Sequence, residues 1–238
     1  MPGSLEHVPA RAASRRFFAA TGAGYDRVAR WSTLAQDGRW RRAALACLPR
    51  GRADVLDYAC GTGLLTLAAA RRCAPGRVVG VDASPDMLAR AREKAARAAL
   101  GRVAFVEADA ERWAPPAAAF DVVLAAYLPK YVALDRWLPR AAEALRPGGL
   151  FVTYDFTYPS WGPARAGWEA WWRFLGPALA RRPAWRAIGL ELPGLVRSTA
   201  WLPALQEALP RHGFEGVAVR PLTFGACTLV TARRRRDA

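Results

Sequence analysis

Cysteine is scarce in this sequence, and long apolar runs are missing. The four cysteines, Cys47, Cys60, Cys73 and Cys227, show no C-x-x-C spacing, which argues against a zinc site or a disulfide framework. No apolar run approaches the roughly 20 residues of a membrane span, and no secretory signal pattern opens the chain. We therefore expect a cytoplasmic protein that holds no metal.

Lysine is nearly absent as well. Only Lys94 and Lys130 are lysine among the 35 basic residues, which outnumber the 20 acidic ones and give a net charge of +15. The arginines are spread along the chain, so we attribute them to a composition bias and expect no specific nucleic-acid partner. The arginines at 233–236 would suit an anionic membrane surface, where each basic residue adds about 1 kcal/mol, so a membrane-peripheral location stays open.

What is present points to an α/β protein. The chain has 238 residues and is 53% hydrophobic, which is enough for one α/β domain with an elaboration. Residues 55–63 read as a short apolar strand, a turn of small residues and the start of a helix, and a second strand at 78–81 ends in Asp82. Open α/β sheets hold nucleoside-bearing cofactors in this way, with the second acid accepting bonds from the ribose hydroxyls.

The turn differs from the dinucleotide fingerprint, which needs three glycines. Only Gly61 and Gly63 are present, and Asp57 just before them would repel a pyrophosphate but suits a cationic amine. The pattern resembles D-x-G-x-G-x-G, the first motif of the class I S-adenosylmethionine-dependent methyltransferases, with Ala59 at the first glycine. Predicted strands and helices follow in that family's order, and Asp109 comes after the third strand.

This resemblance implies both a fold and a cofactor. The fold is an α/β, Rossmann-like sheet, mostly parallel with an antiparallel last strand, and the cofactor is S-adenosylmethionine. The resemblance also implies that Asp109 meets the adenine amino group. Tyr25 is the candidate to cover the methionine end, and a core aromatic is an equally good interpretation of it. The expected cofactor-binding residues are Tyr25, Asp57, Ala59, Gly61, Thr62, Gly63, Asp82, Ala83, Met87, Asp109, Ala110 and Ala125.

The chain divides into six predicted segments. They are a loose N-terminus at 1–14, a helical lid at 15–48, the cofactor-binding core at 49–155, a tryptophan-rich helical insertion at 156–200 on the acceptor side, a helix with two closing strands at 201–232, and a basic tail at 233–238. In the insertion, Trp168, Trp171 and Trp172 share one helix face. That face either packs as core or roofs the acceptor pocket.

The outer segments resemble the ubiquinone and menaquinone biosynthesis C-methyltransferases. The resemblance rests on Tyr25-Asp26, Ser32, Trp40-Arg41 and the segments 212–214 and 222–225. It implies methyl transfer to a small, apolar, aromatic acceptor, and a quinone precursor is the leading candidate for that acceptor. The alternatives are O- or N-methylation of another small natural product and, further off, a nucleic-acid methyltransferase or a cofactor-binding regulator without turnover. The sequence makes no prediction about oligomeric state.

Catalysis on a phenolic ring requires an electron-rich acceptor, and three residues are candidates for producing it. The family carries a Gly-Leu-Arg-Asn signature after the fourth strand, whereas this chain has Tyr127-Leu128-Pro129-Lys130 there. We expect Lys130 to stabilise a phenolate and Tyr127 or Tyr131 to bond the ring oxygen. Asp155 is the candidate base, and a helix cap is an equally good interpretation of it.

Overall fold

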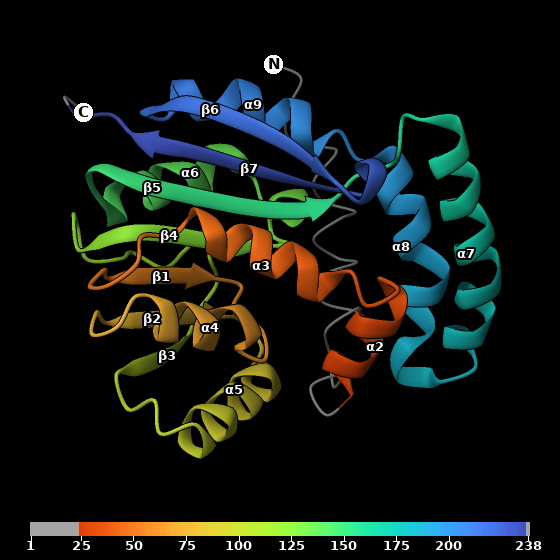
Figure 1. Cartoon of the computed structure of the whole chain (residues 1–238), viewed down its shortest axis with the longest axis horizontal. Coiled ribbons are helices and arrows are strands. Elements are labelled where there is room, and N and C mark those ends of the chain that lie inside the picture. Colours follow the sequence, from red (N-terminus) through yellow and green to blue (C-terminus); the bar gives the residue numbers. More distant parts are fainter. Residues whose placement is uncertain (1–23, 237–238) are drawn as a thin grey trace.

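The computed structural model describes residues 24–236, in which seven strands form one sheet (Figure 1). The strand order is β3-β2-β1-β4-β5-β7-β6; the first five pair in parallel, and β7 runs antiparallel to both of its neighbours. The predicted Rossmann-like sheet with its antiparallel last strand is therefore confirmed. The strands are β1 (Val55–Tyr58), β2 (Val78–Asp82), β3 (Val103–Glu107), β4 (Phe120–Ala126), β5 (Leu145–Phe156), β6 (Phe214–Leu222) and β7 (Cys227–Arg234).

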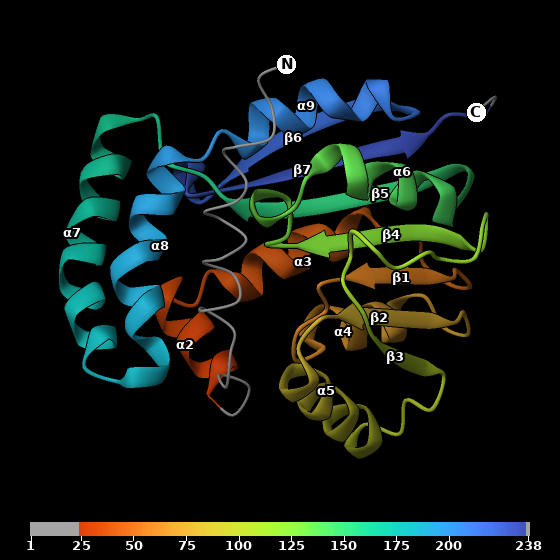
Figure 2. The ribbon, with the colours of Figure 1, turned by 180° about the vertical axis from the view of Figure 1, so that it is seen from behind.

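Helices cover both faces of the sheet (Figures 1 and 2). On one face, Trp40, Leu65 and Ala95 from three helices pack with buried side chains of the central strands. On the other face, Trp137 and Leu205 do the same. Because the central strands are buried on both sides, they read as near-continuous apolar runs. The first layer is α3 (Asp37–Cys47), α4 (Leu64–Arg72) and α5 (Pro85–Arg97), and the second is α6 (Leu134–Ala144) and α9 (Trp201–Arg211).

Three further helices lie beside the carboxyl ends of the parallel strands (Figure 1). They are α2 (Tyr25–Ser32) and the antiparallel pair α7 (Gly162–Ala180) and α8 (Arg186–Ser198). The pair packs closely at two glycines, because a Cβ added to Gly189 would lie 2.4 Å from the carbonyl oxygen of Gly176. The indole Nε1 of Trp171 donates to the Ser32 carbonyl oxygen over 3.2 Å and joins α7 to the end of α2.

One predicted boundary differs from the structure. The last strand continues to Arg234, two residues into the predicted basic tail. The ladder explains the extension, since Arg233 pairs with Leu150 and Arg234 with Phe214. The backbone of half of the arginine run is therefore part of the sheet.

Several expectations concern residues outside 24–236. The loose segment 1–14 and the first part of the lid segment, up to residue 23, lie outside the described residues. Within 24–236, no helix is long and apolar enough to cross a membrane. The same residues contain no cluster of three or more His, Cys, Asp or Glu side chains with the geometry to hold a metal ion.

Candidate functional site

The turn after β1 is built from left-handed backbone. Ala59, Gly61 and Gly63 have φ angles of 54°, 55° and 80°. Glycine adopts this conformation freely, while a residue with a Cβ pays about 1–2 kcal/mol. Ala59 therefore takes the backbone shape of the glycine that the resemblance places there, and accepts its strain. A Cβ at Gly63 would lie 3.1 Å from the Cβ of Ala91, so the turn sits close against α5.

Cys60 fills the space under this turn. A Cβ added to Gly80 of β2 would lie 2.9 Å from its Sγ atom. Burial raises the pKa of the Cys60 thiol well above its usual value, so the thiolate that nucleophilic chemistry needs is disfavoured. Cys60 is a packing residue in this structure.

Asp82 ties the ends of two strands together. Its Oδ2 atom accepts the Gly61 N–H over 2.8 Å, and its Oδ1 atom accepts the Ser84 N–H over 2.8 Å. Burial raises the pKa of Asp82, and the backbone donors oppose that change. The carboxylate fixes the glycine turn relative to the start of α5.

Asp57 is a buried acid, and one of its two carboxylate oxygens lacks a hydrogen-bond partner among the described residues. It is 1% exposed, and its Oδ2 atom accepts the Thr66 hydroxyl over 2.6 Å. Its Oδ1 atom has no hydrogen-bond partner among the described residues. Burial raises the pKa of Asp57 to about 7, and the Asp82 charge adds to the effect. A cationic ligand beside this carboxylate would supply the missing partner.

A cavity of about 620 Å³ opens over these strand ends, within the usual size range of small-molecule sites. It brings together nine of the twelve predicted cofactor residues: Tyr25, Ala59, Gly61, Thr62, Asp82, Ala83, Met87, Asp109 and Ala110. Asp57, Gly63 and Ala125 lie outside its lining. Ala126, one residue beyond Ala125, lines it instead. The small-residue turn, the acid at the end of β2 and the buried Asp57 fit S-adenosylmethionine, which carries a ribose diol and cationic groups.

Four tyrosines line the cavity, and three of them lie within the influence of the Asp37 charge. We call Tyr25, Tyr127, Tyr131 and Tyr154 the tyrosine ring; the Tyr127 and Tyr154 side chains lie 5.1 Å apart between ring centroids. Burial raises the pKa of all four hydroxyls, and the Asp37 charge raises those of Tyr25, Tyr127 and Tyr154 further. The tyrosines are therefore neutral hydrogen-bonding groups at physiological pH.

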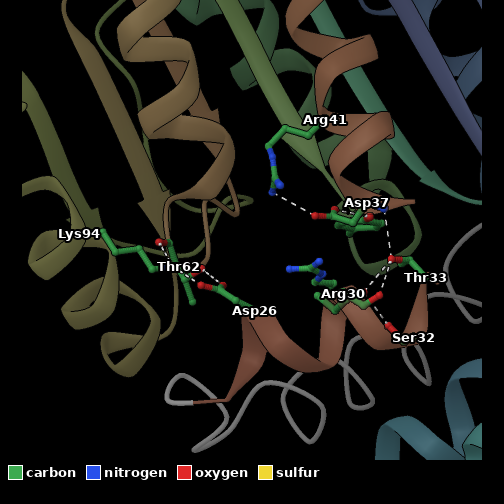
Figure 3. A network of polar contacts seen from close by, with 10 residues as sticks. Asp26, Arg30, Ser32, Thr33, Asp37, Arg41, Thr62 and Lys94 are labelled. Atoms are coloured by element: carbon green, nitrogen blue, oxygen red, sulfur yellow. Dashed lines mark hydrogen bonds and ion pairs between the residues drawn. The ribbon is translucent and has the colours of Figure 1, made fainter. Parts of the chain in front are cut away.

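Asp37, at the start of α3, also lines this part of the cavity. Its Oδ1 atom accepts the Tyr127 hydroxyl over 2.9 Å, and its Oδ2 atom lies 3.0 Å from Nη1 of Arg41, another lining residue (Figure 3). Sequence reasoning did not single out Asp37, because nothing local distinguishes an acid in the first turn of a helix from an ordinary dipole-stabilising residue.

Known proteins share this architecture. A methyltransferase domain model matches residues 55–149. A demethylmenaquinone methyltransferase of Thermus thermophilus is 33% identical over 212 residues, covering 86% of this chain and 94% of that protein. Another, from Deinococcus radiodurans, is 30% identical over 226 residues, covering 94% and 93%. This chain belongs to the ubiquinone/menaquinone C-methyltransferase family of class I S-adenosylmethionine-dependent methyltransferases.

Solved structures agree with this assignment. The S-adenosylmethionine-dependent methyltransferase of Mesorhizobium loti superposes with a TM-score of 0.58 at 25% identity, covering 81% of this chain and 96% of that one. A phosphoethanolamine N-methyltransferase of Haemonchus contortus in complex with S-adenosylmethionine gives a TM-score of 0.59 at 16% identity, covering 83% and 52%. The second likeness shows the shared fold alone. The methyltransferase described here uses S-adenosylmethionine as its methyl donor.

Two of the predicted catalytic residues of this methyltransferase bind each other. The Lys130 ammonium donates to Oδ1 of Asp155 in an ion pair whose side chains are 1% and 0% exposed. Burial lowers the pKa of Lys130 and raises that of Asp155, and each charge opposes the change in its partner. Neither residue lines the cavity, whereas Tyr127 does. Lys130 instead lies behind the tyrosine ring, 4.4 Å from the Tyr131 ring centroid.

The helix α2, which belongs to the predicted lid segment, is joined to the turn after β1 by polar contacts. Oδ1 of Asp26 accepts the Thr62 hydroxyl over 2.5 Å, and its Oδ2 atom lies 2.5 Å from Nζ of Lys94 on α5 (Figure 3). Lys94 also donates to the Thr62 carbonyl oxygen over 3.1 Å. These contacts hold Tyr25, the neighbour of Asp26, at the cavity wall.

The aromatic face of α7 does not line the cavity. Trp168 and Trp172 are 8% and 5% exposed and pack with Tyr131, Trp185 and apolar side chains of α8. Of the two interpretations, the structure favours packing of this face as the core of the α7–α8 pair, because Trp168, Trp171 and Trp172 are absent from the cavity lining. Its contact with the cavity passes through Tyr131, which belongs both to this core and to the tyrosine ring.

Proposed function

We propose that this methyltransferase methylates a ring carbon of a quinol, the reduced form of a quinone precursor. The observation that carries the proposal is the tyrosine ring, whose flat apolar faces and neutral hydroxyls suit an aromatic ring with oxygen substituents. The names of the relatives, demethylmenaquinone methyltransferases and ubiquinone/menaquinone biosynthesis C-methyltransferases, support the same acceptor class. The acceptor is a small molecule in this proposal.

In this proposal the residues of the chain bind the cofactor, orient the acceptor and exclude water from both. S-adenosylmethionine, when bound, supplies an electrophilic methyl group on a sulfonium. Asp57, Asp82 and the turn at Gly61 would hold it, with Asp109 at its adenine and Tyr25 over its methionine end. Tyr127 would orient the acceptor's ring oxygen, and the Lys130–Asp155 pair would keep Tyr127 and Tyr131 in place from behind. Alignment of this kind is worth several kcal/mol of the barrier to methyl transfer.

Product analysis tests this proposal. The purified protein, S-adenosylmethionine carrying a ¹³C-labelled methyl group and a panel of reduced naphthoquinones, benzoquinones and simple phenols would be incubated and analysed by mass spectrometry and NMR. We expect a labelled methyl group on a ring carbon with both hydroxyls intact. A labelled methyl ether, or methylation of an amine in a wider panel but of no quinol, would overturn the proposed carbon methylation.

A peripheral membrane contact completes the proposal, because a quinone precursor with an apolar tail dissolves in lipid. Trp31, Leu34, Trp161 and Phe224 are 62%, 56%, 57% and 75% exposed. The backbone of Leu34 and Phe224 is left-handed, with φ angles of 50° and 55°, so the fold accepts strain in the segments that present them. Arg39 lies in the groove beside Phe224. Aromatic and basic side chains together are typical of membrane interfaces.

Vesicle sedimentation tests this contact. The protein should sediment with vesicles containing phosphatidylglycerol more than with phosphatidylcholine vesicles, and W161A/F224A should lose most of the binding. F174A is the matched control, since Phe174 is 74% exposed on the same helix that Trp161 precedes. Equal binding by W161A/F224A and wild type would remove this surface from the proposal.

A further inference from the structure

The tyrosine ring leaves one acid in reach of an acceptor hydroxyl. The four tyrosines are neutral, and the Lys130–Asp155 pair is buried behind them. Among the described residues that line the cavity, the other acids sit at the carboxyl ends of β2 and β3 or follow them, on the side assigned to the cofactor: Asp82, Asp86, Asp109 and Glu111. Asp37 is the acid that the fold places against the tyrosine ring.

We propose that Asp37 is the general base that removes the acceptor's hydroxyl proton, and that Arg41 stabilises the oxyanion it leaves. This inference rests on the proposed function in requiring an acceptor that carries a hydroxyl group. Oδ1 of the Asp37 carboxylate accepts the Tyr127 hydroxyl, and Oδ2 forms an ion pair with Arg41. A carboxylate oxygen has two lone pairs, so each retains one that a substrate hydroxyl can use.

The Asp37 carboxylate is fixed in position, as a general base must be. Asp37 is 8% exposed, and its backbone N–H donates to the Thr33 hydroxyl over 3.2 Å. Thr33 in turn donates to the Ala29 carbonyl oxygen over 2.8 Å and so links the end of α2 to the start of α3. Neither Asp37 oxygen needs to break its present bond when it accepts a proton transiently on the free lone pair.

The charge balance favours the proton transfer. Before it, Asp37 is negative, Arg41 is positive and the acceptor is neutral; after it, Asp37 is neutral and the oxyanion faces Arg41. The net charge of the three groups is zero in both states, so the half-buried site need not create an isolated charge. Tyr127 keeps its donor bond to Asp37 in both states, and Arg41, which has five N–H donors, can donate to the oxyanion while it stays beside Asp37.

The bonds and protons then balance as follows. The oxyanion's electron pair moves into the ring, and the ring carbon forms a bond to the methyl carbon as the carbon–sulfur bond breaks with its pair left on sulfur. The methylated ring carbon then releases its own proton to water and regains aromaticity, and Asp37 returns the hydroxyl proton to the ring oxygen. One proton is released overall for each methyl group transferred.

Two near-isosteric variants separate this role from a structural one. Asp37→Asn keeps an oxygen that can accept the Tyr127 hydroxyl but cannot take a proton, and Tyr127→Phe removes that hydrogen bond but keeps the base. We expect D37N to lower kcat about 100-fold or more, as loss of a general base does, and Y127F to lower it about tenfold or less. D37E should recover part of the activity. S-adenosylmethionine affinity by calorimetry and the melting temperature should change little in D37N.

The acidity of the acceptor gives the decisive readout. With quinols or phenols of increasing hydroxyl acidity, the D37N defect should shrink, because an acceptor that ionises in solution no longer needs the base. A defect that is the same for every acceptor, or a D37N enzyme as active as wild type, would overturn the proposal. A wild-type enzyme that produces methyl ethers rejects the proposed carbon methylation but leaves this comparison valid, since oxygen methylation also needs the proton removed. A wild-type enzyme active only on amines would overturn both.

Discussion

Lys94 on α5 and Asp26 on the lid helix α2 lie 68 positions apart in sequence, yet their charged atoms are 2.5 Å apart. The Lys94 ammonium also reaches the Thr62 carbonyl oxygen, and Asp26 accepts the Thr62 hydroxyl. The pair therefore joins three elements at the cofactor turn. Its side chains are 22% and 39% exposed, so its worth to global stability is small.

We expect Lys94→Met and Asp26→Asn to speed the release of S-adenosylmethionine instead of unfolding the protein. Loss of the contact frees α2 with Tyr25, and the dissociation rate should rise about fivefold, equivalent to about 1 kcal/mol. Stopped-flow displacement measures that rate. Arg90→Met is the control, because it breaks an exposed ion pair of the same helix, with Glu93 at 3.2 Å. An R90M effect as large as that of K94M would contradict the prediction.

Asp82 should contribute more to cofactor affinity than Asp109. Asp82→Ala removes the proposed partner of the ribose diol and leaves the N–H groups of Gly61 and Ser84 without the carboxylate that they now bind. Hydrogen bonds to charged groups are worth about 1.5–3 kcal/mol, so we expect affinity to fall about 10–100-fold. Asp109 is exposed and binds the nearby Glu111 N–H, and D109A should lose less than tenfold. Calorimetric titration measures both, and unchanged affinity in D82A would remove Asp82 from the site.

The residues that sequence reasoning located are those whose role is local. Asp82 and Gly61 follow from strand ends and a turn whose spacing is visible in the chain. Asp37 and Tyr154 were missed because α3 must first dock across the carboxyl ends of distant strands. The Lys130–Asp155 pair shows the same limit, since two residues were predicted separately and only the packing of Lys130 against β5 reveals that they neutralise each other.

The buried Asp57 predicts a dependence of stability on pH. Its folded-state pKa of about 7 lies above the usual value of 3.8, so between these values the folded protein holds a proton that the unfolded chain has lost. The free energy of unfolding should therefore fall as the pH rises from about 4 to about 7 and level off above it. The change attributable to Asp57 is bounded at about 4 kcal/mol.

Urea unfolding at several pH values, for wild type and Asp57→Asn, measures this contribution. As the pH rises from 5 to 8, the free energy of unfolding of wild type should fall relative to that of D57N. The reason is that the amide of D57N never ionises, whereas the buried Asp57 carboxyl does. The proposed placement of the S-adenosylmethionine cation beside Asp57 predicts that the bound cofactor stabilises wild type more at pH 8 than at pH 6 and that D57N loses this dependence. Parallel pH profiles for both proteins would contradict the prediction.

The Lys130–Asp155 pair should matter as a unit. Lys130→Met leaves the Asp155 carboxylate buried without its partner, and breaking a buried pair in this way costs about 3–5 kcal/mol of unfolding free energy. Replacing both residues, as K130M/D155L, should restore much of that loss, because no uncompensated charge is left. Denaturant titration compares the three proteins. A K130M protein as stable as wild type would show that Asp155 finds another partner or is protonated.

The α7–α8 core should carry stability and not acceptor selectivity. Trp172 is 5% exposed and packs in the apolar cluster that includes Trp168 and Ile188. Trp172→Ala should cost about 3–5 kcal/mol of unfolding free energy. Phe174, two positions along the helix, is 74% exposed, and F174A should change stability by less than about 0.5 kcal/mol.

Because Trp172 does not line the cavity, KM should change equally for short- and long-tailed quinols. If instead W172A kept the wild-type melting temperature and raised KM mainly for long-tailed acceptors, the helix face would have to reach the acceptor's tail, and its packing in the core would be the wrong account of its function.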